Sequence, residues 1–124
     1  MKILIIAEKP QIAQALEKVI PGTITSTKDG VIRKGDYIIT WAYGHLLTLK
    51  EPEDYNEEYK NWNLNQLPIY FDNWGQKPGK DDSHKGGQSK ASRIKQIGLL
   101  LKEADLVING ADNDDEVIRT YVFV

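Results

Sequence analysis

The hydrophobic positions near the start of the chain follow the pattern of a buried strand and then of an amphipathic helix. Lys2–Ala7 is an apolar run, rich in β-branched residues, of the length typical of a strand buried on both faces. Pro10 suits the first turn of a helix, which Pro21 and Gly22 would end. The apolar residues between them recur at helical spacing: Ile12, Ala13, Leu16, Val19 and Ile20.

After this helix the pattern changes to that of short strands and then returns to a helix and a strand. Strands are predicted over Thr23–Thr27, Val31–Arg33 and Tyr37–Ala42, with turns between them. Gln88–Ala104 has helical spacing, and Leu106–Ile108 is a second core strand. This order predicts one α/β domain over residues 1–124, with a central, mainly parallel sheet flanked by helices and a small antiparallel insertion.

Within the second predicted helix, the apolar and the basic residues separate onto different faces. The apolar face carries Ile94, Ile97, Leu101 and Ala104. The basic residues are expected largely off that face: Lys90, Arg93, Lys95 and Lys102.

The middle of the chain is polar and aromatic. Residues 72–87 are dominated by Gly, Lys, Asp and Ser and are predicted to be an exposed loop within the domain. The preceding Glu51–Phe71 is rich in aromatic residues, among them Tyr55, Tyr59, Trp62 and Tyr70. Their rings suit either stacking on nucleic-acid bases or burial that pins an irregular segment to the core, and burial is the commoner use.

Length and composition narrow the class of protein. At 124 residues the chain has room for one core, and its lack of cysteine excludes a disulfide framework or a thiolate metal site. Its longest apolar runs are far shorter than a membrane span, and its first residues lack the features of a signal peptide. We therefore expect a cytoplasmic protein with no membrane partner; the oligomeric state is left open.

The net charge of −2 conceals two segments of opposite charge. Lys77–Lys102 contains seven Lys or Arg and two acids, whereas Glu103–Arg119 contains six acids and one Arg. A basic stretch before an acidic one suits a phosphate-backbone partner whose cation neutralises the carboxylates. Charge runs are also common on ordinary solvated surfaces, so this feature alone leaves both interpretations open.

A dense group of carboxylates follows the second core strand. An extended backbone there would place Asp112, Asp114 and Glu116 on one side. Carboxylate oxygens suit hard cations, and magnesium uses one or two carboxylates together with water and substrate phosphates. The same residues also suit an acidic helix cap, so this segment alone is compatible with either a magnesium site or a helix cap.

Glu8 and Lys9 stand at the end of the first predicted strand, where open α/β sheets gather their ligands. If the two core strands are parallel neighbours, Glu8 converges with the Asp112 group, and a divalent cation offsets the repulsion between like charges. Glu8 would then donate a proton to a leaving oxygen, and Lys9 would contact a phosphate. His45, beside Gly44, suits either a structural hydrogen bond or a phosphate contact.

Several strings of residues together resemble bacterial topoisomerase III, a type IA DNA topoisomerase. They are Ile5–Ala13 with Glu8-Lys9-Pro10, Thr40–Leu49 with Gly44-His45-Leu46-Leu47, Glu51–Tyr55, and Lys60–Ile69. The spacing Asp112-x-Asp114-x-Glu116 resembles the acidic signature of that family's Toprim domain. The resemblance runs over nearly the whole chain.

This resemblance implies a Toprim (Rossmann-like) fold and a contribution to the cleavage and rejoining of single-stranded DNA. Glu8 would be the general acid, and Lys9 and His45 would stand near the scissile phosphate. Magnesium would be held by Asp112, Asp114, Glu116 and Glu8.

Three positions depart from the family pattern. Asp115 stands where the family has Arg, Val117 where it has Gly, and Gln11 where it has Ser. Asp115 adds repulsion and removes a phosphate contact, and Val117 lacks the backbone freedom of Gly. A Ser at position 11 would cap a helix or bind phosphate, and Gln caps poorly. These departures keep two alternatives open: a non-catalytic nucleic-acid or protein-binding module with a decayed site, and a stand-alone Toprim nuclease.

The nucleophilic Tyr of type IA enzymes lies in a later domain that this chain lacks. Tyr121 stands in no matching motif and is not assigned as the nucleophile. We expect a Toprim domain truncated at its C-terminal end, whose partners are single-stranded DNA and the missing topoisomerase domains. Alone, it is expected not to relax DNA.

Overall fold

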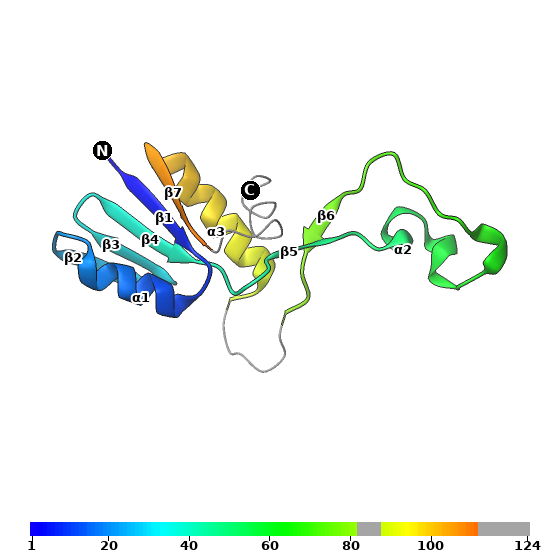
Figure 1. Cartoon of the computed structure of the whole chain (residues 1–124), viewed down its shortest axis with the longest axis horizontal. Coiled ribbons are helices and arrows are strands. Elements are labelled where there is room, and N and C mark those ends of the chain that lie inside the picture. The colour runs from blue at the N-terminus through cyan, green and yellow to red at the C-terminus, as the bar shows by residue number, and fades with distance from the viewer. Residues whose placement is uncertain (82–87, 112–124) are drawn as a thin grey trace.

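The structure is a computed structural model that describes residues 1–81 and 88–111 of the chain. Its centre is a five-stranded sheet in the order β2-β3-β4-β1-β7, with a helix on each face (Figure 1). The strands are β1 (Ile3–Ala7), β2 (Ile24–Lys28), β3 (Val31–Lys34), β4 (Tyr37–Trp41) and β7 (Leu106–Gly110). The covering helices are α1 (Pro10–Val19) and α3 (Lys90–Glu103). The predicted α/β class is confirmed.

The central strand β1 has apolar side chains on both faces, as the sequence predicted. It is parallel to β4 on one side and to β7 on the other, whereas β2, β3 and β4 are joined by antiparallel pairing. Leu4 and Ile6 belong to a core shared with α3, and Ile5 and Ala7 to a core shared with α1. A strand with a helix over each face needs apolar residues at consecutive positions, which explains why this run does not alternate with polar residues.

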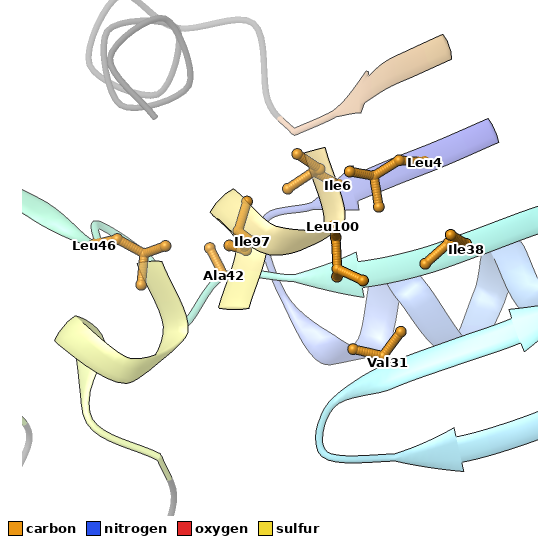
Figure 2. Close-up of a cluster of buried hydrophobic side chains, with 8 residues drawn as sticks. All are labelled: Leu4, Ile6, Val31, Ile38, Ala42, Leu46, Ile97 and Leu100. Atoms are coloured by element: carbon orange, nitrogen blue, oxygen red, sulfur yellow. The ribbon is translucent and has the colours of Figure 1, made fainter. Parts of the chain in front are cut away.

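The core beneath α3 joins this helix to residues of β1, β3 and β4 and to the segment that follows β4. Figure 2 shows Ile97 and Leu100 of α3 over Leu4 and Ile6 of β1 and Ile38 of β4. All of these side chains are buried. Burying such aliphatic side chains contributes about 1.5–3 kcal/mol each, so the helix is held mainly by this face.

Both helices begin and end where the local sequence favours it. Pro10 opens α1, and the chain is extended at Ile20, just before Pro21. The Ser89 hydroxyl caps α3 by accepting a hydrogen bond from the backbone N–H of Ser92 at 3.2 Å. Neither helix, nor any other helix in residues 1–81 and 88–111, has the length and apolar character needed to cross a membrane.

The turn between β2 and β3 has two residues with positive φ, as a tight hairpin requires. Asp29 has φ of 56° and Gly30 has φ of 72°, which is the conformation of a type I′ turn. The Asp-Gly pair is a strong sequence signal for this turn, and the predicted hairpin is confirmed.

Residues 47–79 form an arm that extends away from the sheet (Figure 1). At its base β5 (Leu47–Leu49) pairs antiparallel with β6 (Gln76–Pro78), so part of the stretch 72–87 is a short strand. Beyond this ribbon lie α2 (Pro52–Tyr55) and two 3₁₀ turns, η1 (Glu57–Lys60) and η2 (Leu64–Gln66). The structure thus contains a small antiparallel sheet, as predicted, but at the base of the arm; the predicted short strands of Thr23–Ala42 are β2, β3 and β4 of the main sheet.

The aromatic residues of the arm pack mainly against one another. Tyr55 stacks on Phe71 with ring centroids 4.1 Å apart, and Trp74 meets Phe71 edge to face at 5.2 Å. The expectation that these aromatics pin the segment to the core is therefore wrong: Tyr55 and Tyr59 pack on Phe71 within the arm, and Trp62 is 93% exposed and Tyr70 84% exposed. The arm is built around its own small aromatic cluster because it lies away from the sheet.

Candidate functional site at the carboxyl edge of the sheet

Three parallel strands end side by side. Ala7 at the end of β1 pairs in register with Trp41 of β4 and with Gly110 of β7. The N–H of Ala42 also donates to the carbonyl of Ala7 at 2.9 Å. Because the carboxyl ends of parallel strands form one edge, residues that follow these strands are brought together there. We call this edge, with the residues that follow β1, β4 and β7, the carboxyl edge.

Glu8 is the first residue after β1 and is the carboxylate at the centre of this edge. Its side chain is only 13% exposed. Oε1 lies 3.9 Å from Lys9 Nζ, whereas Oε2 is buried and has no hydrogen-bond partner in the described part of the chain. Leaving a buried acceptor unsatisfied costs about 1–3 kcal/mol, and more if it is charged. A ligand that paired with this oxygen would remove that cost.

Lys9 follows Glu8 and occupies the N-cap position of α1, with its side chain 60% exposed. No side chain caps this helix within the described residues, and its first turn has no acidic residue. A helix N-terminus and an ammonium together favour an anion, so this corner suits a phosphate. Because Lys9 is the N-cap, Gln11 lies inside the helix, and a Ser at position 11 would not stand at the capping position.

His45 lies four residues beyond the end of β4, after Gly44 with φ of 71°. It lines a groove of about 700 Å³ between the base of the arm and the start of α3. The same groove is lined by three lysines of the basic stretch, Lys77, Lys80 and Lys90, and by two glutamates at the start of α2, Glu51 and Glu53. His45 thus joins the carboxyl edge to a groove of mixed charge.

The acidic segment itself lies outside the described residues: Asp112, Asp114, Asp115, Glu116 and Val117, with Tyr121 beyond them. The described residues end at Ala111, one residue after β7. The strand β7 itself ends at the carboxyl edge, beside Glu8. A Cβ on Gly110 would lie 3.3 Å from the carbonyl oxygen of Ile6, so glycine permits the close approach of β7 to β1. Within residues 1–81 and 88–111, no three His, Asp or Glu side chains gather as a metal site.

Among the described residues, Glu8 has an oxygen that suits a hard cation. The unpartnered oxygen of Glu8 is the type of ligand that magnesium prefers, and it stands where β7 directs the acidic segment. The carboxyl edge therefore fits a divalent ion through Glu8, and this fit rests on a single side chain.

Arg93 closes the same end of the sheet and was not predicted to do so. It is fully buried, although its charge predicted a position on the exposed side of α3. Arg93 precedes the core residue Ile97 by four residues, which places both on the same face of the helix. A Cβ on Gly30 would lie 2.3 Å from its Nη1, so glycine is needed there. Its guanidinium donates to the carbonyls of Trp41 (2.7 Å), Gly30 (2.7 Å) and Asp29 (3.1 Å), to Thr40 Oγ1 (2.9 Å) and to Gln96 Oε1 (2.8 Å).

The Arg93 charge is unusual because no carboxylate within the described ranges contacts it. Burial lowers the pKa of this guanidinium below its ordinary value. The group remains charged because arginine is protonated at all physiological pH values. It also lies over the rings of Trp41 and Tyr43, at 5.1 and 5.5 Å from their centroids. Arg93 thereby orders the backbone that leads from β4 to His45.

The fold and the carboxyl edge together define a class of protein: an α/β domain in which a carboxylate and a lysine lie where parallel strands end. The sequence pattern of the Toprim domain family matches residues 3–123. Because the match covers nearly the whole chain, the chain belongs to the Toprim domain family. Toprim domains generally bind a divalent metal ion.

Three similar proteins illustrate the likeness. The DNA topoisomerase 3 of Vibrio cholerae is 39% identical over 115 residues, which cover 91% of this chain and 16% of that protein. That of Pasteurella multocida is 39% identical over 114 residues, with the same coverage. That of Staphylococcus epidermidis is 45% identical over 69 residues, covering 56% of this chain and 9% of that protein. The chain therefore spans about a sixth of the length of the first two.

Proposed function

We propose that this chain is the Toprim part of a topoisomerase III-like type IA DNA topoisomerase, which cleaves and rejoins single DNA strands. The observation that carries the proposal is the buried, unpartnered carboxylate oxygen of Glu8 at the end of β1, beside the strand that leads to Asp112. The named relatives support the choice of reaction, because they are DNA topoisomerases 3.

Glu8 is the proposed general acid. A carboxyl group at the end of a central strand is held by a rigid backbone, and its partial burial keeps bulk water from competing for its proton. It would protonate the sugar oxygen that leaves when a phosphodiester is attacked. In rejoining, the same group would take that proton back.

Magnesium is the proposed metal, held by Glu8 together with Asp112, Asp114 and Glu116. When bound, a divalent ion neutralises phosphate charge and orders the phosphate for rejoining. The carboxylates of the acidic segment would otherwise repel one another and Glu8.

Lys9 and His45 are the proposed phosphate contacts. Lys9 presents an exposed ammonium at the start of α1, and the two together favour an oxyanion. His45 follows the end of β4, whose backbone is held by Arg93. These residues would hold the scissile phosphate on the side of the edge away from the sheet.

The attacking Tyr would come from another domain of the full-length protein, as the resemblance implies. Single-stranded DNA is the proposed substrate and the cytoplasm the proposed location. The chain by itself is expected not to relax DNA, because it would hold the phosphate and protonate the leaving sugar oxygen without supplying the attacking Tyr.

The test is a titration of Mg²⁺ into the ¹⁵N-labelled full chain, followed by NMR. We expect saturable binding that is lost in Asp112→Ala/Asp114→Ala and at least about tenfold weaker in Glu8→Gln, because losing a residue that merely supports a metal ligand already weakens metal binding about 10–100-fold. Glu57→Gln/Glu58→Gln, which removes two exposed acids of the arm, is the matched control and should bind normally.

Two outcomes would overturn the proposal. No saturable binding by the wild-type chain would favour a decayed, non-catalytic module. Cutting of a single-stranded oligonucleotide by the purified chain with Mg²⁺, abolished in Asp112→Ala/Asp114→Ala, would identify a stand-alone nuclease instead.

A further inference from the structure

The outer part of the arm carries an exposed apolar surface, and we call its residues 51–71 the arm tip. Four of its large apolar side chains are 48–93% exposed: Trp62, Leu64, Leu67 and Tyr70. Single apolar residues are normal on a protein surface, but here four stand within nine residues of sequence. Such a concentration, surrounded by polar residues, is typical of a surface that binds a partner.

A pocket of about 240 Å³ lies against the arm tip. Its lining combines apolar side chains with charged groups and includes Tyr59, Trp62, Leu67, Glu51, Glu53 and Lys80. The volume is below the range of about 300–1,000 Å³ typical of small-molecule pockets, so the pocket suits a single side chain. Two carboxylates against one ammonium favour a cationic side chain, whose apolar stem can pack on the rings.

The arm tip keeps its shape without the exposed rings. Asn56 Oδ1 accepts a hydrogen bond from the N–H of Glu58 at 3.1 Å, and Asn63 Oδ1 accepts one from the N–H of Asn65 at 3.0 Å. The side-chain amide of Gln66 donates to the carbonyl of Glu58 at 3.5 Å, which joins the two 3₁₀ turns. A surface that is ordered before binding loses less conformational entropy when a partner docks on it.

The charge of the arm tip opposes a nucleic acid and favours a basic protein surface. The tip contains five Asp or Glu and one Lys, a net charge of −4. Asp54 pairs with Lys77. Glu53, Glu57 and Glu58 are exposed and form no ion pair among the described residues. Uncompensated acids repel a phosphate backbone and attract Lys and Arg.

The longer relatives indicate where such a basic surface would come from. The matched part of the Vibrio cholerae protein is 16% of its length, so most of a protein of that kind lies outside the region that this chain matches. The arm extends away from the sheet and is therefore placed to contact other parts of a longer polypeptide (Figure 1). Within one polypeptide a small contact is sufficient, because the covalent link raises the effective concentration of the partner.

We propose that the arm tip docks on a basic surface of the remaining part of the full-length protein, with one Lys or Arg side chain of that part entering the pocket beside Glu51 and Glu53. Trp62 and Tyr70 would form the apolar centre of this contact, because such rings dominate the binding energy of protein interfaces. The inference rests on the proposed function, which supplies the rest of the polypeptide, and it adds the contact that joins the two parts.

The experiment measures how fast hydroxyl radicals oxidise Trp62 and Tyr70, with mass spectrometry as the readout and EDTA present. It compares the isolated full chain with a chimera in which this chain replaces the matching first part of the Vibrio cholerae protein. Both rates should be at least about fivefold lower in the chimera, because a docked partner excludes water from the centre of an interface. Leu46, which is buried in the main core, should be oxidised slowly in both proteins and reports that the domain has folded.

A charge reversal tests the chemistry assigned to the partner. Glu53→Lys places a like charge beside the entering Lys or Arg, and should raise the oxidation rate of Trp62 in the chimera by about threefold or more. Asp36→Lys is the matched control, because it makes the same change of charge at an exposed position of the main domain before β4. It should leave the protection of Trp62 unchanged.

The proposal is overturned if Trp62 and Tyr70 are oxidised as fast in the chimera as in the isolated chain, or if their protection survives Glu53→Lys. Protection of Trp62 in the isolated chain would also overturn it. If that protection accompanies self-association in sedimentation, the occupant is a second copy, and if it requires d(T)₁₂, the occupant is a nucleic acid. Should the chimera fail to fold, a second chimera carries only residues 51–71 of this chain in the Vibrio cholerae protein, and the same rates decide.

The docking contact and the magnesium site can fail independently. EDTA removes divalent ions from the oxidation experiment, and the Mg²⁺ titration uses the isolated chain, in which the partner is absent. Mg²⁺ binding without protection of Trp62 would overturn the docking contact alone. Protection of Trp62 without Mg²⁺ binding would overturn the metal site alone.

Discussion

Two glutamates stand at opposite ends of the parallel strands, and the structure treats them differently. Glu103 at the end of α3 accepts two hydrogen bonds of 2.8 Å from Arg33 and one of 2.8 Å from Lys2. Glu8 at the carboxyl edge has one oxygen 3.9 Å from Lys9 and the other without a partner in the described residues. One carboxylate is neutralised by its neighbours, and the other is left for a ligand.

Two arginines differ in the same way. Arg33 at the amino end forms its fork with Glu103, and the hydrogen bond to that carboxylate raises the pKa of Arg33. Arg93 at the carboxyl end is fully buried, is held by carbonyl, hydroxyl and amide oxygens, and meets no carboxylate among the described residues. Charges at the amino end compensate one another through short hydrogen bonds, whereas at the carboxyl end Arg93 is held by neutral oxygens and, among the described residues, Glu8 has only the longer contact of 3.9 Å with Lys9.

This difference indicates which end serves stability and which serves binding. A paired carboxylate contributes to folding and has little capacity left for a ligand. An unpaired buried one costs stability and persists where the surrounding fold is strong enough to hold it. The contrast can be tested by removing each charge in turn, from the largest expected effect to the smallest.

The largest effect is expected from Arg93→Met. This change keeps an apolar stem of similar length but removes the five hydrogen bonds of the buried guanidinium, and should lower the free energy of unfolding by about 3 kcal/mol. Urea denaturation followed by circular dichroism measures it. Lys95→Met, at an exposed position of the same helix, is the control. A loss below about 1 kcal/mol would show that Arg93 does not hold this end together.

A smaller effect is expected from Glu103→Gln. The amide cannot accept the charged fork of Arg33 or pair with Lys2, and these groups are partly exposed, so a loss of about 1 kcal/mol is expected. Glu57→Gln, an exposed glutamate on the arm, should change stability by less than about 0.5 kcal/mol. Equal losses of stability in Glu103→Gln and Glu57→Gln would contradict the stabilising role assigned to Glu103 and its partners Arg33 and Lys2.

The stability contributed by Glu103 should also depend on pH. Its hydrogen bonds to Arg33 and then to Lys2 hold its pKa at about 2, below the ordinary 4.5. A depressed carboxyl pKa means that the stabilisation is present above pH 4.5 and is lost as pH falls toward 2. The difference in unfolding free energy between the wild type and Glu103→Gln should therefore shrink from pH 5 to pH 2. A difference that stays constant over this range would contradict the assignment.

The smallest effect on stability is expected from Glu8→Gln. The amide removes a buried charge that costs stability but also loses the contact of 3.9 Å with Lys9, so without metal these opposing effects should change the free energy of unfolding by less than about 0.5 kcal/mol. With Mg²⁺ present, the wild type alone should gain thermal stability, because an ion that binds the folded state stabilises it. A large loss without metal would show that Glu8 is structural, as Glu103 is.

Much of the fold could be predicted because the deciding signals are local. The unbroken apolar run of β1, Pro10 at the start of α1 and the Asp29-Gly30 turn each determine their element through nearby residues. The position of Glu8 at the end of a central strand followed from the same pattern. The burial of Arg93 could not be predicted from such local patterns, because its five partners lie on β4, on the turn before β3 and on its own helix.

The arm shows the same division. Its aromatic composition was visible in the sequence, but Tyr55 and Phe71 stack while Trp62 remains exposed, and ring type does not distinguish them. The buried Gln76 Oε1, which has no hydrogen-bond partner among the described residues, carried no sequence signal, since Gln76 stands in no motif. Long-range packing decides which aromatic ring is buried and which amide keeps an unused oxygen.

The sequence alone thus determined the strands and helices of the main sheet, the α/β class and the candidate chemistry of Glu8, Lys9 and His45, because periodicity, turn residues and functional groups are properties of short segments. Only the tertiary structure decided that β7 pairs with β1 beside Glu8, that Arg93 is buried without a carboxylate, and that Glu103 is neutralised. These outcomes depend on which segments meet across the sheet, and the free energy that selects those contacts comes from the packing of the whole core.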